Sequence, residues 1–206
     1  AVDGILLLTS VIVDHDDPAF MASLKRLFPG IPLVSIGNRL SGIPSILIQG
    51  RSSMLKLMEH LITAHGYHDF LYLGGPGTHH ENIEREEAFR EAVRPGEGKQ
   101  NIRGIIHNAS FAQRDAEAEA RDLIARGDTE PPDAIVAASD NMASGVLKAL
   151  RETGDRRWQS CAVTGFDDIP RAALEVPALT TVHQPFDLAG RIAVQTLRDM
   201  IEGRVP

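Results

Sequence analysis

Two patterns of apolar and polar residues alternate along the chain. Short, nearly continuous apolar runs, such as Val2–Leu8, Phe70–Leu73 and Ala134–Ala138, are typical of parallel strands buried on both faces. Longer stretches between these runs carry apolar residues at helical spacing, as in Ser52–Ala64. The regular exchange of the two patterns indicates an α/β protein with parallel sheets, helices on their faces and right-handed crossovers.

The pattern assigns most of the chain to named elements. Strands are predicted at Val2–Leu8, Ile31–Ile36, Ser45–Ile48, Phe70–Leu73, Ile102–Ile106, Ala134–Ala138, Ala162–Phe166 and Ala178–Gln184. Helices are predicted at Pro18–Phe28, Ser52–Ala64, Asn82–Val93, Ala112–Arg126, Asn141–Glu152 and Leu188–Glu202. The last predicted strand is stopped by Pro185, because proline cannot donate to a sheet ladder.

Length, composition and charge limit the classes of protein to which this chain can belong. The chain has 206 residues, 43% of them hydrophobic, which allows one large domain or two small lobes with a sizeable core. Its net charge is −7 and it has no long basic run. This argues against the chain binding nucleic acid by itself, because neutralising phosphates requires clustered Lys and Arg. Its single cysteine excludes an internal disulfide. Neither a signal peptide nor an apolar run of membrane-spanning length is evident in the sequence.

The stretch from Cys161 to Gln184 carries the strongest candidate chemistry. It reads CAVTGFDDIPRAALEVPALTTVHQ, with an apolar strand that delivers Asp167 and Asp168 into a polar loop. Open α/β sheets bind ligands outside the carboxyl ends of their strands, which is where this loop is expected to lie. Carboxylates accept hydrogen bonds from hydroxyls or amines, so the loop predicts a site for a small polar molecule.

Three motifs resemble one family. VTGFDDIP, PALTTVHQP and, upstream of both, AASDNMASGVLKALRE are similar to the sugar-binding domain of LacI-type transcription regulators, which has the periplasmic-binding-protein-like (type I) fold. The resemblance extends over essentially the whole chain. It implies two lobes, with residues 1–49 and 186–206 in the N-terminal lobe and residues 50–185 in the C-terminal lobe. It also implies that the first lobe is incomplete, because the family's first two strand–helix units and its last strand have no counterpart here.

The resemblance also implies a function. We expect the sensing domain of a bacterial, cytoplasmic regulator that binds a small-molecule effector, a sugar or related metabolite, in a cleft between lobes and signals by lobe closure. DNA would be bound only through a helix-turn-helix head absent from this chain, and a homodimer is expected. No enzyme activity, cofactor or membrane partner is expected, since the sequence contains no nucleophile, metal or cofactor motif.

The resemblance assigns ligand-binding roles to Asp167, Arg85 and Phe111. Asp167 matches the family's aspartate that takes sugar hydroxyls; the alternative is that Asp167 or its neighbour Asp168 caps a turn or helix. Arg85 matches the family's ligand-contacting arginine, whose planar guanidinium can donate hydrogen bonds to two oxygens at once. The alternative is a solvated helix residue paired with Glu81. Phe111 falls where the family stacks an aromatic ring on the ligand; the alternative is an ordinary core phenylalanine.

Ser139 and Asp140 complete the expected binding residues. They follow the strand Ala134–Ala138, where the family usually carries Asn-Asp and where the first residue often touches the ligand. Ser139 replaces the asparagine and offers a shorter side chain with one donor. For Asp140 the sequence also allows a different role, capping the helix predicted to begin at Asn141.

Two departures from the family pattern leave alternatives open. Gly37, in the run SIGN, stands where the family typically has an aspartate, and Gln49-Gly50 replaces a common Asp-Asn pair. SIGN and the run from His68 to Ala92 look more like related sensor domains fused to histidine kinases or diguanylate cyclases. A secreted sugar-binding transport protein of the same fold is a further alternative.

The eight histidines do not predict a metal site. His60, His65 and His68 are close in sequence and His79 and His80 are adjacent, but no HExxH or equivalent spacing occurs. His60 and His65 are five residues apart, so they are not expected to share a helix face. We therefore expect no bound metal.

Overall fold

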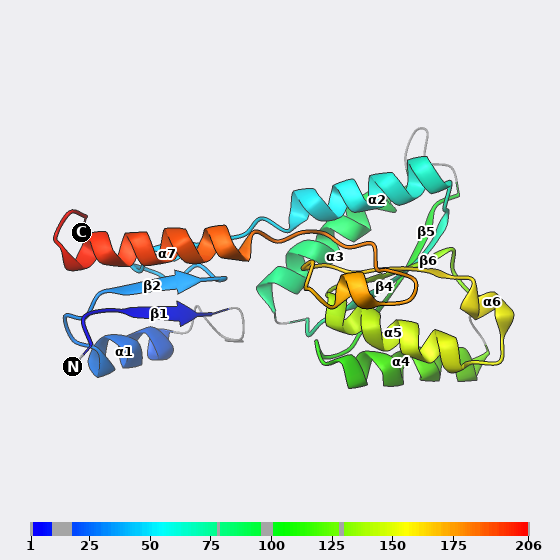
Figure 1. Ribbon diagram of the computed structural model, residues 1–206, viewed down its shortest axis with the longest axis horizontal. Helices are drawn as coiled ribbons and strands as arrows, with labels where there is room; N and C mark the ends of the chain where they lie inside the picture. The colour runs from blue at the N-terminus through cyan, green and yellow to red at the C-terminus, as the bar shows by residue number, and fades with distance from the viewer. Residues whose placement is uncertain (1, 10–17, 78, 96–100, 128–129, 206) are drawn as a thin grey trace. The chain divides into compact units, whose positions relative to one another are not determined.

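The computed structural model describes residues 2–9, 18–77, 79–95, 101–127 and 130–205. The described residues fall into two compact units, both traced in Figure 1. The first unit holds the chain up to Gln49, residues 79–81 and the segment from Pro185 onward. The second unit runs from Gly50 to Gly77 and from Asn82 to Gln184.

Strands and helices alternate along the chain as predicted. The strands are β1 (Ile5–Leu8), β2 (Leu33–Ile36), β3 (Ser45–Ile46), β4 (Asp69–Gly74), β5 (Arg103–Asn108), β6 (Ala134–Ala137) and β7 (Ala162–Thr164). The helices are α1 (Pro18–Leu27), α2 (Arg51–His65), α3 (His80–Ala92), α4 (Gln113–Arg126), α5 (Asp140–Glu152), α6 (Arg156–Gln159) and α7 (Phe186–Ile201), with a 3₁₀ turn η1 (Ala172–Leu174).

The first unit is a parallel sheet in the order β1-β2-β3. An apolar cluster joins α1 to one face of this sheet, and its buried members are Met21, Leu24, Leu33, Leu40 and Ile43. Helix α7 lies on the other face in Figure 1, and a side chain at Gly4, just before β1, would lie 2.8 Å from the Leu197 side chain of α7. In the turn SIGN, Gly37 has φ +110°, a conformation that glycine adopts without steric cost.

The second unit is a four-stranded parallel sheet in the order β5-β4-β6-β7. In Figure 1, α2 and α3 lie on one face of this sheet and α4 and α5 on the other. The central strands β4 and β6 are buried almost throughout, which confirms the interpretation of Phe70–Leu73 and Ala134–Ala138 as strands covered on both sides. All four strands end at the same edge of the sheet because all are parallel.

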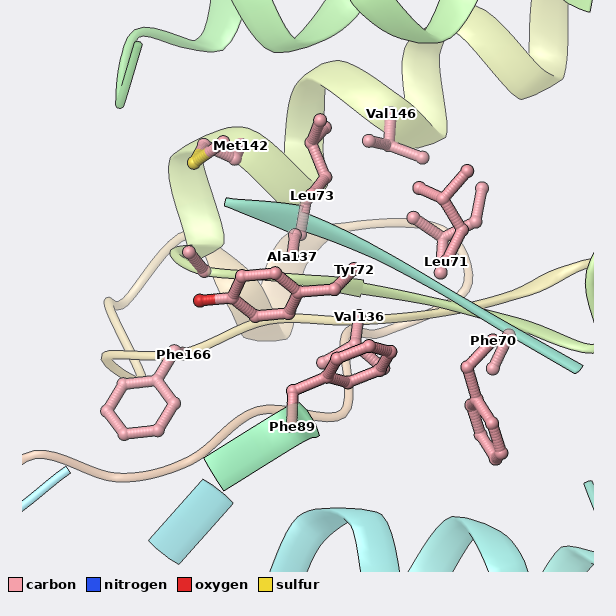
Figure 2. Packing of buried hydrophobic residues seen from close by; sticks show 14 of the residues in the cluster. Phe70, Leu71, Tyr72, Leu73, Phe89, Val136, Ala137, Met142, Val146 and Phe166 are labelled. Atoms are coloured by element: carbon pink, nitrogen blue, oxygen red, sulfur yellow. The ribbon is translucent and has the colours of Figure 1, made fainter. Parts of the chain in front are cut away.

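The core of the second unit follows the alternation of side chains along β4. Figure 2 shows Leu71 and Leu73 on the side of Met142 and Val146 from α5, and Phe70 and Tyr72 on the opposite side. The ring of Tyr72 stacks on Phe89 of α3, with ring centroids 5.1 Å apart. Burial raises the pKa of the Tyr72 hydroxyl, which donates a hydrogen bond to Asn82 Oδ1.

The structure corrects one predicted strand. Residues 178–184 follow β7 in parallel through the bonds Gly165 N–H to Thr180 O and Asp167 N–H to Val182 O, both 2.9 Å. They pair only at isolated bridges and form no continuous strand. Among the described residues, no helix has the length and apolar character needed to cross a bilayer.

Candidate ligand-binding site

Every predicted binding residue except Arg85 follows the carboxyl end of a strand in the second unit. Phe111 comes after β5, Ser139 and Asp140 after β6, and Asp167 after β7. Arg85 reaches the same edge from the second turn of α3. The parallel topology therefore brings together residues that are up to 82 positions apart in the sequence, as expected for the binding edge of an open α/β sheet.

Arg85 is buried rather than solvated. Its side chain is only 3% exposed, its Nη1 donates a 2.7 Å hydrogen bond to Ala138 O, and its Cζ lies 4.1 Å from the centre of the Phe166 ring. A guanidinium suits this position because its flat face packs on an aromatic ring while its edge donates hydrogen bonds. The alternative of a solvent-exposed helix arginine is wrong.

The Asp167 carboxylate lies beside this arginine and is 19% exposed. Its Oδ1 is 3.9 Å from Arg85 Nη2 and accepts a 2.5 Å hydrogen bond from Gln184 Nε2. Asp167 and Asp168 have φ values of +123° and +57°, which non-glycine residues adopt only when surrounding contacts hold them there. The contacts around Asp167 thus fix its carboxylate at the sheet edge while leaving part of it accessible.

The structure assigns the cap of α5 to Ser139, not Asp140. Helix α5 begins at Asp140, and Ser139 Oγ accepts a 3.3 Å hydrogen bond from Met142 N–H. The interpretation of Asp140 as the cap is therefore wrong, because the helix starts one residue earlier than predicted and the cap position moves with it. Ser139 as a whole is almost fully buried.

Asp140 instead joins the start of α5 to the loop after β7. Its Oδ2 accepts a 2.8 Å hydrogen bond from Ile169 N–H, and its Oδ1 accepts a 2.5 Å hydrogen bond from Thr181 Oγ1. Burial raises the pKa of the Asp140 carboxyl, although both hydrogen bonds act in the opposite direction. Since both oxygens are engaged within the protein, this geometry favours a positioning role, and direct ligand contact by Asp140 stays a prediction.

Phe111 packs against the glycine turn that follows β4. A Cβ atom at Gly75 would lie 2.3 Å from Phe111 Cζ, so only glycine allows the half-buried ring to approach this closely. Asn82 of α3 holds the turn through two hydrogen bonds with Gly75: its Oδ1 accepts from Gly75 N–H at 2.7 Å, and its Nδ2 donates to Gly75 O at 3.1 Å. The ring is therefore fixed at the same strand edge as Asp167.

Sequence reasoning missed three residues that hold this site together. Gln184 orients Asp167, Thr181 binds Asp140, and Asn82 shapes the turn beneath Phe111. Gln184 and Thr181 lie inside the quoted motif PALTTVHQP, which was the available signal. Asn82 opens the predicted helix Asn82–Val93, but nothing local distinguishes it from a solvated residue.

Asp168 forms a separate, exposed pair. Its Oδ2 lies 2.9 Å from His183 Nδ1, and its side chain is about half exposed. Its backbone N–H donates to Thr181 Oγ1 at 3.3 Å. The two adjacent aspartates therefore differ in role: Asp167 contacts buried groups at the sheet edge, and Asp168 contacts the neighbouring segment at the surface.

Three comparisons with known proteins bear on this arrangement. The model of the periplasmic binding protein-like domain family matches residues 58–206. The ribose operon repressor of Halalkalibacterium halodurans is 30% identical over 203 residues, covering 98% of this chain and 56% of that protein. The transcriptional regulator CelR of Thermobifida fusca is 30% identical over 213 residues, covering 98% of this chain and 58% of that protein.

A solved structure supports the same relationship at the level of the backbone. The transcriptional regulator CelR–cellobiose complex superposes with a TM-score of 0.79 and 29% identity, covering 100% of this chain and 61% of that one. The chain thus spans somewhat more than half the length of the relatives that it matches. The α/β architecture predicted from the strand and helix pattern is confirmed, and so is the type I periplasmic-binding-protein fold that the family resemblance implied.

Proposed function

This chain belongs to the periplasmic binding protein-like domain family, in the form found in LacI-type transcription regulators, and from that premise we propose that it senses a small polyhydroxylated effector. The effector binds at the carboxyl edge of the sheet in the second unit. The observation that carries the proposal is the Arg85–Asp167 pair, with Phe111 and Ser139 at the same edge.

The chemistry of these side chains fits a sugar-like molecule. The Asp167 carboxylate accepts hydrogen bonds from hydroxyls, and the Arg85 guanidinium holds that carboxylate in place by charge. The ring of Phe111 offers an apolar surface of the kind that the C–H face of a sugar ring packs against. A ligand with hydroxyls on its edge and C–H groups on its face can therefore bind the Asp167 carboxylate, which Arg85 holds in place, and pack against the Phe111 ring.

Two relatives support a sugar as the effector. One is named as a ribose operon repressor, and a solved relative is a complex with cellobiose. In the whole protein we propose that effector binding closes the two lobes and changes the output of an attached DNA-binding head. The whole protein would act as a homodimer in the bacterial cytoplasm. In such a mechanism a ligand shifts the equilibrium only by its difference in affinity for the open and closed states.

Isothermal titration of the protein with a panel of neutral sugars, sugar phosphates and purines tests the proposal. A neutral monosaccharide or disaccharide should bind, and Asp167→Asn should weaken it by about 10- to 100-fold, because a hydrogen bond to a charged group contributes about 1.5–3 kcal/mol. Asp122→Asn, the same change at an exposed position on α4, is the control and should bind as the unmodified protein does.

Two outcomes would overturn the assignment. Equal affinity in Asp167→Asn and the unmodified protein would remove Asp167 from the site. Binding of purines with no response to any sugar would show that the effector is not a sugar. In that case, weaker purine binding by Asp167→Asn would still support Asp167 as a residue of the binding site.

A further inference from the structure

Two histidines meet at the carboxyl end of α2. His60 Nε2 and His65 Nε2 are 3.2 Å apart, and the rings are nearly perpendicular, with centroids 4.9 Å apart. The ring of Tyr67 stacks on His65 at 5.2 Å. Both histidines are exposed, so a solute can reach the paired nitrogens from solvent.

The two rings meet although His60 and His65 are five positions apart, a spacing that does not place them on one helix face. His65 is the last residue of α2, and Gly66 follows in the left-handed conformation with φ +67°. The stacked ring of Tyr67 lies beyond this turn and contacts His65. Five-residue spacing separates two positions around a continuing helix, but at a helix end the imidazoles can turn toward each other.

The geometry points to a binding site for a divalent transition-metal ion, and we infer that His60 and His65 chelate it through their Nε2 atoms. Two nitrogens at about 2.0–2.1 Å from one metal are separated by about 2.9 Å for a right angle at the metal and about 3.3 Å for a tetrahedral angle. The observed 3.2 Å lies between these values. Neutral imidazole is a ligand that Zn²⁺, Cu²⁺ and Ni²⁺ share.

The surroundings favour a bound cation and leave coordination positions for water. The last carbonyls of α2 carry partial negative charge, which stabilises positive charge near a helix carboxyl end, and the chain has a net charge of −7. Among the residues that the structure describes, no group of three or more His, Cys, Asp or Glu side chains has the arrangement of a metal site. The pair therefore supplies two ligands, and water completes the sphere.

This site is separate from the proposed effector site. A Cβ atom at Gly50, which precedes α2, would lie 3.5 Å from Arg85 Nε, so the amino end of α2 adjoins the effector residues. The histidine pair lies at the other end of this 15-residue helix, about 20 Å away at 1.5 Å per residue. Metal binding is thus independent of the proposed function and can be tested without knowing the effector.

Titration calorimetry with ZnCl₂ and NiCl₂ on the 206-residue chain tests the inference. One ion should bind per chain, and His60→Ala or His65→Ala should each weaken binding by at least about tenfold, because each variant leaves a single imidazole. His68→Ala, the matched loss of a nearby exposed histidine, should leave the affinity unchanged. In NMR spectra, Ni²⁺ should broaden the ring signals of His60 and His65 first.

A plain hydrogen bond between the two rings is the competing explanation for the short distance. In that case neither metal would bind with one-to-one stoichiometry, and the inference would be overturned. An equal loss of affinity in His60→Ala, His65→Ala and His68→Ala would overturn it as well, because it would indicate diffuse binding to surface histidines. Circular dichroism spectra of the three variants should match, which separates loss of the site from loss of the fold.

Discussion

At the scale of single residues, burial decides what each candidate side chain can do. Arg85 is charged and almost inaccessible, so the Ala138 carbonyl, the Phe166 ring and the Asp167 carboxylate must together replace the water that it has lost. Asp140 is equally buried, and both of its carboxylate oxygens accept hydrogen bonds from neighbouring groups. Asp167 keeps part of its surface open, which makes it the carboxylate best placed to exchange protein partners for a ligand.

The single cysteine should be slow to react. Burial is the main cause that raises the pKa of the Cys161 thiol to about 11. Against its usual value of 9.0, that shift lowers the thiolate fraction at neutral pH by about 100-fold, and the thiolate is the reactive species. Alkylation by iodoacetamide at pH 8, followed by mass spectrometry, should be slower than for the urea-unfolded chain by a comparable factor. Equal rates would contradict the raised pKa of Cys161.

Asp140 should make folding stability depend on pH. Its pKa is raised in the folded state, so the native protein binds more protons than the unfolded chain above the usual aspartate pKa. Its contribution to the free energy of unfolding therefore falls as pH rises through the interval between the usual pKa and the raised one. The free energies of unfolding of the unmodified protein and of Asp140→Asn can be measured in urea at several pH values from about 4 upward. The stability of the unmodified protein relative to the variant should decline as the pH rises. A constant difference would contradict the shift.

At the scale of elements, α4 and α5 pack closely enough for their backbones to meet. A Cβ atom at Gly145 of α5 would lie 2.3 Å from Gln113 O and 2.9 Å from Glu117 N, both backbone atoms of α4. Outside this contact, Lys148 and Arg121 both bind the carboxylate of Glu117. Exposed ion pairs contribute little, so the close backbone approach is the feature that sets the spacing of these helices.

Alanine at two helical glycines should therefore have opposite effects. Gly145→Ala should lower the free energy of unfolding by about 1–3 kcal/mol, because the backbone of α4 cannot move aside cheaply. Gly190→Ala in α7 meets no atom within 4 Å and should raise stability by up to about 1 kcal/mol through helix propensity. Thermal unfolding followed by circular dichroism measures both. A neutral Gly145→Ala would show that the two helices can separate.

At the scale of the whole molecule, the two units differ in the size of their cores. Among the described residues, the buried cluster of the first unit has five members, Met21, Leu24, Leu33, Leu40 and Ile43, whereas that of the second unit includes both central strands and parts of the flanking helices. Hydrophobic burial is the main favourable contribution to folding, and small cores leave a narrow margin over conformational entropy. The first unit should be the less stable of the two.

Urea unfolding followed by two probes should reveal that difference. Trp158, the only tryptophan, is buried in the core of the second unit, so its fluorescence reports on that unit alone. Far-ultraviolet circular dichroism reports on helices of both units, including α1 and α7. The dichroism signal should begin to fall at lower urea concentrations than the fluorescence change. Coincident transitions would instead indicate a single cooperative unit.

Much of the fold was predictable from local pattern. Helical and strand periodicities are properties of neighbouring residues, so the order of elements and the burial of β4 and β6 could be predicted from the sequence. The parallel order of strands also placed Asp167 at the carboxyl edge of a sheet. The strand predicted at Ala178–Gln184 was wrong because its pairing is confined to isolated bridges with one neighbour.

The contacts that give the site its character depend on residues far apart in the chain. Arg85 is 53 positions from Ala138, and Asp140 is 41 positions from Thr181. No local pattern specifies which backbone carbonyl a buried arginine reaches, whether Ser139 or its neighbour caps α5, or that two histidine rings meet at a helix end. Packing settles these points, because a side chain turns toward whichever partners the folded chain brings within reach. Local periodicity therefore accounts for the elements, and long-range contacts account for the chemistry.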